Sequence, residues 1–182
     1  MRKTYVIGNW KMNGSTAANK ALLDGLKAGV PAARAGVEIA VCPPFVYLDS
    51  VSAQVSGSPI GVGSQDVSEY EKGAYTGEVP VAQLKEVGAT YAIIGHSERR
   101  SLFGETNEWV AKKTVAAPAG GLVPVVCVGE LEAEREGGLT EKVLASQLDA
   151  VLAAIPAPVP GSIVIAYEPV WAIGTGKTAT PE

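Results

Sequence analysis

The sequence predicts an α/β protein built around a parallel β-sheet. Short apolar runs rich in β-branched residues alternate with longer stretches of helical pattern, as expected when helices connect parallel strands. The runs are continuously apolar, which is typical of strands covered on both faces. We expect six strands, at residues 5–8, 37–42, 60–63, 91–95, 123–128 and 163–167.

Four stretches between these runs are predicted to be helices. Residues 16–26 are rich in Ala, Leu and Lys, and residues 81–87 form a shorter segment. Residues 107–117 begin at Asn107, a residue type that favours the N-cap position. Residues 140–155 begin at Thr140 and carry apolar side chains at helical spacing.

Composition limits the classes of function. The chain has 182 residues, of which 47% are hydrophobic and 19% charged, so we expect a single globular domain over residues 1–182. A net charge of -4 argues against general binding to nucleic acid or to an anionic membrane surface. The apolar runs are too short to span a membrane, and the N-terminus turns polar too early for a signal peptide, which favours the cytoplasm. Cys42 and Cys127 each end an apolar run and are expected to be buried free thiols.

Polar residues follow five of the expected strands. In an open sheet such residues gather at one switch point, whereas in a closed barrel successive strand ends supply one face. The first strand also lacks the Gly-x-Gly-x-x-Gly pattern of a dinucleotide site. The barrel is therefore favoured. The polar residues are Asn9, Lys11, Gln65, Asp66, His96, Glu98, Glu130 and Glu168.

Six strands cannot close an eight-stranded barrel. Thr180-Pro181-Glu182 has the pattern of a helix start, with a capping Thr followed by Pro and an acid. We therefore expect this sequence to be part of a longer domain. We also expect the first and sixth strands to expose their edges, which favours aggregation.

Glu168 is the strongest candidate for a catalytic base. It ends a buried strand and is followed by a proline, an apolar tip and a glycine-containing segment, the arrangement of a carboxylate beneath a closing lid. A lid that excludes water makes a carboxylate a better base toward a C–H bond. The alternative is a solvated loop acid. The expected lid comprises Pro169, Val170, Trp171, Ala172, Ile173, Gly174, Thr175, Gly176 and Lys177.

Two further strand ends and the expected lid carry candidate site residues. His96 is the only histidine, and a lone histidine is often structural. Backbone N–H groups at a helix start would favour the neutral form of its ring, which can donate a hydrogen bond to an enolate oxygen. Lys11 is either a surface lysine or a cation for a phosphate or carbonyl oxygen, and Asn9 could contact the same oxygens. Gly174 could offer its backbone N–H to a phosphate.

Other charged residues near these strand ends have simpler explanations. Glu98, Arg99 and Arg100 form a charged helix start, although Glu98 could also support Lys11 and His96. For Cys127 and Glu130, which close the fifth strand, a structural role is favoured.

Five segments, in order along nearly the whole chain, closely resemble the signature segments of the triosephosphate isomerase family. They are Asn-Trp-Lys-Met-Asn at 9–13, Gly-Ala-Tyr-Thr-Gly-Glu at 73–78, Ile-Gly-His-Ser-Glu-Arg-Arg at 94–100, Pro-Val-Val-Cys-Val-Gly-Glu at 124–130 and Ala-Tyr-Glu-Pro-Val-Trp-Ala-Ile-Gly-Thr-Gly at 166–176.

The resemblance implies a (β/α)8 TIM barrel, of which this sequence carries the first six strands. It implies interconversion of dihydroxyacetone phosphate and glyceraldehyde 3-phosphate without cofactor or metal. By similarity, Glu168 moves the proton, His96 polarises the carbonyl, Lys11 supplies positive charge, Asn9 orients the substrate and Gly174 grips the phosphate. Glu98 and Cys127 would support them. Residues 169–171 and 177–179 resemble the two hinges of the lid.

The family resemblance also implies a homodimer, with Thr76 at the tip of a long loop that reaches the neighbouring subunit. Asp66 stands where the family often has Asn, which we regard as tolerable. Nothing here matches the family's two C-terminal glycine-rich phosphate loops. Two alternatives therefore stay open: a catalytically impaired fragment that acts as a self-associating or partner-completed half-barrel, and a different sugar-phosphate isomerase on the same fold.

Overall fold

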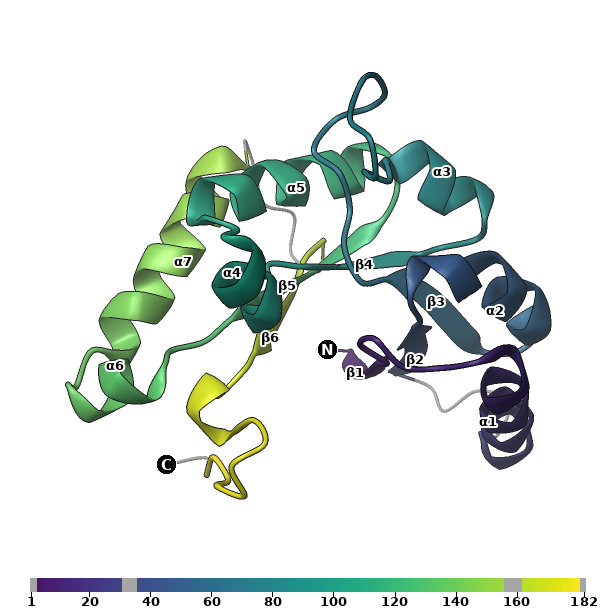
Figure 1. The fold of residues 1–182 in the computed structure, drawn as a ribbon, viewed down its shortest axis with the longest axis horizontal. Coiled ribbons are helices and arrows are strands. Elements are labelled where there is room, and N and C mark those ends of the chain that lie inside the picture. Colours follow the sequence, from purple (N-terminus) through teal and green to yellow (C-terminus); the bar gives the residue numbers. More distant parts are fainter. Residues whose placement is uncertain (1–2, 31–35, 156–161, 181–182) are drawn as a thin grey trace.

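A computed structural model describes residues 3–30, 36–155 and 162–180. Its centre is one six-stranded parallel sheet in the order β1-β2-β3-β4-β5-β6, and the sheet curls into a half-barrel (Figure 1). The sequence order of the strands is therefore also their spatial order, as in the first part of a TIM barrel. The strands are β1 (Thr4–Asn9), β2 (Val37–Cys42), β3 (Ile60–Ser64), β4 (Tyr91–Ile94), β5 (Val123–Val128) and β6 (Val164–Tyr167).

Alternate residues of the strands serve two different packing layers. One face packs against the helices and forms the main core, to which Val41, Val62, Ile94 and Val126 contribute. The concave face packs side chains against one another inside the half-barrel, where Ala40, Tyr91 and Val125 form one cluster and Cys42, Ile93 and Cys127 another. These two layers explain why the central strands are apolar throughout.

The edge strands depart from the expectation that every strand is covered on both faces. β1 and β6 alternate between partly buried and exposed residues, and Val6 is 56% and Ile165 47% exposed. Both strands lie at ends of the sheet order, so each has one neighbouring strand. Within the described residues, no helix packs extensively against either of them. The expected exposure of both sheet edges is confirmed.

All four expected helices are present, with small differences at their ends. The N-cap predicted for the third helix is wrong. The N-cap is Thr106, whose side chain accepts a hydrogen bond from the Trp109 N–H at 3.2 Å, and Asn107 is the first helical residue. Periodicity did not indicate the short helices α2 and α6, while the charged helix start at residues 98–100 is confirmed as α4. The helices are α1 (Thr16–Gly29), α2 (Leu48–Val55), α3 (Val81–Glu86), α4 (Ser97–Phe103), α5 (Asn107–Ala119), α6 (Glu132–Glu136) and α7 (Thr140–Ala154), with 3-10 turns at Phe45–Tyr47 and Val170–Ala172.

A long loop between β3 and α3 projects away from the sheet (Figure 1). Inside it, the rings of Tyr70 and Tyr75 stack with centroids 3.7 Å apart and an interplanar angle of 4°. Thr76 is exposed.

The helix start expected at Thr180-Pro181-Glu182 falls partly outside the described residues, and the single domain over residues 1–182 stays a prediction. No helix in the described ranges is long and apolar enough to cross a membrane.

Candidate active site

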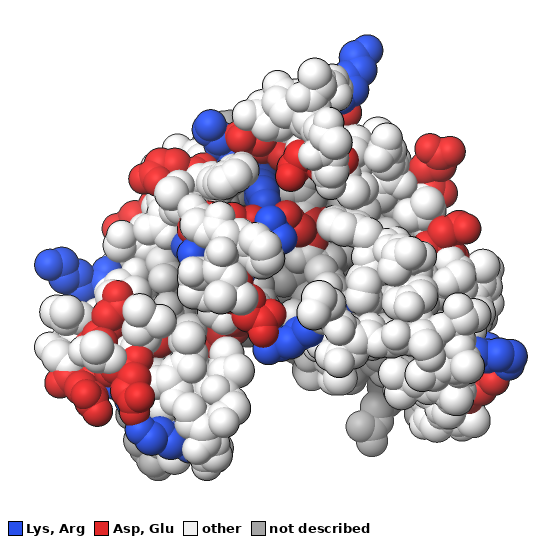
Figure 2. Space-filling model, viewed as in Figure 1, with Lys and Arg blue, Asp and Glu red and all other residues white. Residues whose placement is uncertain are grey.

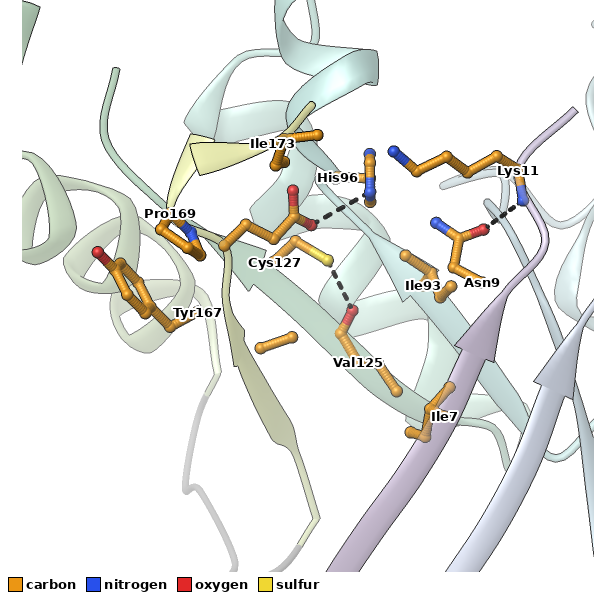
Figure 3. A pocket seen from close by; sticks show the side chains of 12 residues that line it. Ile7, Asn9, Lys11, Ile93, His96, Val125, Cys127, Tyr167, Pro169 and Ile173 are labelled. Atoms are coloured by element: carbon orange, nitrogen blue, oxygen red, sulfur yellow. Dashed lines mark hydrogen bonds and ion pairs between the residues drawn. The ribbon is translucent and has the colours of Figure 1, made fainter. Parts of the chain in front are cut away.

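The carboxyl ends of β1, β4 and β6 bring four of the expected polar residues to one cavity of about 340 Å³. Figure 3 shows Lys11 reaching toward His96 across the top of this cavity, with Asn9 beside Lys11. Glu168 completes the polar lining. Because a pocket of this size suits a small ligand, the arrangement is a candidate active site. The apolar lining comes from Ile7, Ile93, Val125, Ala166 and Ile173.

His96 is held in one orientation by the helix that follows it. It is the N-cap of α4, and its Nδ1 accepts a hydrogen bond from the Glu98 backbone N–H at 3.2 Å. With Nδ1 acting as acceptor, a neutral ring carries its proton on Nε2. Nε2 lies 3.5 Å from Oε1 of Glu168. The ring can therefore offer a hydrogen-bond donor to the cavity.

Glu168 follows directly after β6, and its side chain is only 14% exposed. Its backbone N–H donates to the Val128 carbonyl at 2.7 Å, and its Oε2 accepts from the Ser97 N–H at 3.3 Å. Cys127 on β5 lines the same cavity (Figure 3). Burial, and next the negative charge of Glu168, raise the pKa of the Cys127 thiol, so the thiol stays neutral. Both cysteines are buried and free, as expected.

Lys11 occupies a strained backbone position that neighbouring side chains hold in place. Its φ is 51°, the left-handed region that non-glycine residues rarely adopt. Its N–H donates to Asn9 Oδ1 at 2.9 Å, and its carbonyl accepts from Gln65 Nε2 at 2.8 Å. Its Nζ lies 2.8 Å from Oε1 of Glu98. Glu98, in the first turn of α4, thus contacts both Lys11 and His96.

The expected lid lies against α6 and the end of β5. The indole N–H of Trp171 donates to Oε1 of Glu130 at 3.0 Å, and the guanidinium of Arg135 lies 4.3 Å above the indole ring. At the end of the expected lid, Lys177 forms an ion pair with Glu132. Glu130 is completely buried and also accepts from the Tyr167 hydroxyl. Sequence reasoning gave Glu130 a general structural role and missed that it accepts from Trp171 of the expected lid.

Several of the expected site residues do not line this cavity, among them Glu98, Thr76 and most of the expected lid. Gly174, with φ +70°, is exposed within the lid, whereas Pro169 and Ile173 line the cavity. Thr76 lies on the projecting loop. Among the described residues, no three His, Cys, Asp or Glu side chains are grouped as metal ligands would be.

A second hollow of about 640 Å³ adjoins the first and shares Asn9, Lys11 and His96 with it. Its rim is apolar and exposed: Met12 is 95%, Leu102 73% and Phe103 66% exposed. Figure 2 shows acidic and basic side chains intermixed around the hollowed centre of this face. An exposed group of large apolar side chains at the rim of a polar hollow is typical of a contact surface.

Comparison with known proteins agrees with this geometry. Residues 4–182 match the family model described as triosephosphate isomerase. The triosephosphate isomerase of Thiobacillus denitrificans is 57% identical over 182 residues, covering all of this chain and 72% of that protein. Those of Cupriavidus taiwanensis and Nitrosococcus oceani are 56% and 50% identical and are covered over 73% and 72% of their lengths. With a family match over almost its full length and a cavity formed at the ends of its parallel strands, this chain belongs to the triosephosphate isomerase family.

Proposed function

We propose that this chain interconverts dihydroxyacetone phosphate and D-glyceraldehyde 3-phosphate by proton transfer through an enediolate, without cofactor or metal. One observation carries the proposal: the Glu168 carboxylate and the His96 Nε2 face each other at 3.5 Å in a small cavity that Lys11 also lines. A carboxylate base, a neutral hydrogen-bond donor and a cation are the three groups that such a reaction needs.

In the proposed mechanism, Glu168 takes a proton from the carbon beside the carbonyl. The electrons of that C–H bond form a carbon–carbon double bond, and the carbonyl oxygen becomes negative. His96 donates a hydrogen bond from Nε2 to this oxygen, and Lys11 stabilises the charge. Glu168 then returns the proton to the neighbouring carbon, while the hydroxyl proton on the first carbon passes to the former carbonyl oxygen, so that the first carbon becomes the new carbonyl. Because Glu168 now accepts from the Ser97 N–H, it must leave that contact when it reaches the substrate carbon.

The substrate phosphate would extend from the reacting carbons toward the lid. Asn9 orients the substrate oxygens, and the Gly174 N–H contacts the phosphate once the lid closes. A lid that moves would have to change the contacts of Trp171 with Glu130 and of Lys177 with Glu132. A closed lid excludes water, which strengthens the electrostatic interactions in the cavity and protects the enediolate from losing its phosphate.

We further propose that the chain functions as a homodimer in the cytoplasm, within glycolysis and gluconeogenesis. The projecting loop with Thr76 at its tip would insert beside the apolar rim of Met12, Leu102 and Phe103 in a second copy. The pre-stacked tyrosines reduce the conformational entropy lost when this loop docks. Sedimentation at several protein concentrations tests this, and a monomer at all of them would contradict it.

The test of the activity is isomerisation of each triose phosphate, together with uptake of solvent deuterium at the substrate carbon. We expect Glu168→Gln to lower both rates by about 10²–10⁴-fold because it removes the base. Glu141→Gln, an exposed acid on α7, is the matched control and should leave both rates unchanged. Equal rates in the two variants would contradict the assignment of Glu168.

The alternative is a catalytically impaired half-barrel that self-associates or is completed by a partner. The exposed edge residues Val6 and Ile165 favour it. A folded chain without turnover, which gains activity when a polypeptide carrying two further βα units is added, would support this alternative. Turnover by the chain alone would exclude it.

A further inference from the structure

The guanidinium of Arg100 connects the ends of two neighbouring strands. Its Nε donates to the carbonyl of Gly95 at 2.8 Å, and its Nη2 donates to the carbonyl of Cys127 at 3.3 Å. The register between β4 and β5 ends at the pair Ile94↔Val126, so both carbonyls lie one residue beyond the last paired positions. Arg100 thus joins the two strands where the backbone ladder no longer does.

The two carbonyls belong to the backbone segments that carry the proposed reacting groups. Gly95 directly precedes His96. Cys127 is registered with Ala166 on β6, two residues before Glu168. A shift of the β4 end relative to the β5 end therefore changes the separation between the imidazole and the carboxylate.

The guanidinium is also held by a hydrogen bond to the first residue of α5. Its Nη1 donates to Asn107 Oδ1 at 2.7 Å, and Asn107 in turn lies within hydrogen-bond distance of Ser146 on α7. This contact is the role of Asn107 in place of the expected N-cap. A planar guanidinium can direct three donors at once, whereas a lysine ammonium carries no such fixed geometry.

Glycine at position 95 permits this close approach. Its φ is +69°, and a Cβ there would lie 3.0 Å from Nη2 of Arg100 and 2.8 Å from Val110. Burial lowers the pKa of the Arg100 guanidinium, and the nearby negative charges of Glu105 and Glu168 oppose this effect. An arginine with these partners remains charged at neutral pH, so all three donors are retained.

We propose that Arg100 is a positioning residue that sets the separation between His96 and Glu168 by joining the ends of β4 and β5. It contacts neither of the two side chains through a hydrogen bond and acts through their backbones. The proposal rests on the proposed isomerase function for its kinetic consequence, but its geometric content is independent of turnover.

The kinetic test compares Arg100→Lys with Arg99→Lys. Arg99 lies on the same helix and pairs with Asp66 and Glu105, but it bonds to neither strand end. We expect Arg100→Lys to lower kcat by about 100-fold, because misplacement by about 1 Å has an effect of that size, with KM changed by less than about threefold. Arg99→Lys should change kcat by less than about threefold even where it lowers the thermal midpoint.

The second readout is independent of activity. His96 is the only histidine, so a ¹⁵N imidazole spectrum reports on one ring. The imidazole resonances should move in Arg100→Lys and stay in place in Arg99→Lys. Asn107→Ala removes the hydrogen bond to the guanidinium together with the contacts to Ser146. It should move the resonances less and in the same direction, and it serves as the test if Arg100→Lys does not fold.

The outcomes separate the two proposals. If the unmodified chain shows no turnover, the proposed function fails, and the imidazole comparison still decides the role of Arg100. If Arg100→Lys and Asn107→Ala fold and leave the imidazole resonances unchanged, the positioning role is refuted. A loss of stability alone, with kcat and the resonances retained, also refutes it.

Discussion

Replacing Lys113 by methionine should destabilise the protein far more than the same change at its neighbour Lys112. The Lys113 side chain is 1% exposed, and its Nζ lies 2.8 Å from Asp66 and 2.5 Å from Glu105. The Lys112 side chain is 65% exposed and lies 3.3 Å from Glu69. The two lysines are thus adjacent in sequence and opposite in environment.

The expected magnitudes follow from burial. Lys113→Met leaves two buried carboxylates without their ammonium partner, and breaking a buried pair in this way costs about 3–5 kcal/mol. Arg99 also pairs with both carboxylates and still neutralises part of their charge in the variant. We therefore expect Lys113→Met to lower the free energy of unfolding by about 3 kcal/mol. An exposed pair contributes about 0–1 kcal/mol, so Lys112→Met should change the unfolding free energy by less than about 1 kcal/mol.

The assay is equilibrium unfolding in urea, read as the midpoint at constant slope. The pH dependence adds a second check. Burial raises the pKa of Asp66 above its ordinary value, although the positive charges of Lys113 and Arg99 oppose the shift, so removing Lys113 raises it further. A carboxyl with a raised folded pKa stabilises the fold on protonation, so the variant should recover stability relative to wild type as the pH is lowered. Equal losses for the two lysine variants, or a difference that grows toward acid, would refute this reasoning.

Three further predictions concern the lid, a glycine and the thiols. Trp171→Phe removes the N–H that binds Glu130 and should speed amide exchange in residues 170–177 about tenfold; unchanged exchange would show that the bond does not hold the lid. Gly95→Ala combines positive φ with a clash and should cost about 2–4 kcal/mol in denaturant unfolding, against about 1–2 kcal/mol for Gly57→Ala, which has positive φ and open space; equal costs would contradict the clash. Burial raises the pKa of Cys42 to about 12, so a thiol reagent near neutral pH should label it only in the unfolded chain, and rapid labelling of the folded chain would contradict this.

The strands and the residues that meet at their ends could be predicted because both signals are local. An apolar run followed by a polar residue marks the end of a buried strand, and in a parallel barrel these ends share one face. That rule alone brings Asn9, Lys11, His96 and Glu168 to one cavity. It needs no knowledge of which side chains touch.

Contacts between distant segments could not be predicted in the same way. Lys112 and Lys113 look alike in the sequence, and only the packing of α5 against the β3 loop decides which one is buried. Glu130 meets Trp171 from 41 residues away, and α6 has only five residues, too few for a periodic pattern. Asn107 matches a cap by residue type, but Thr106 caps the helix and Asn107 binds Arg100.

The geometry of the candidate site across the sheet depends on α4. Lys11 follows β1 and Glu168 follows β6, which are opposite ends of the strand order, and no strand pair joins them in the described sheet. Instead, both side chains contact the start of α4: Lys11 through Glu98, and Glu168 through the Ser97 N–H and His96. A displacement of an edge strand therefore moves one of these groups relative to His96. A displacement of α4 moves His96 relative to both at once, so substitutions that loosen α4 should impair the site more than equally destabilising substitutions in β1 or β6.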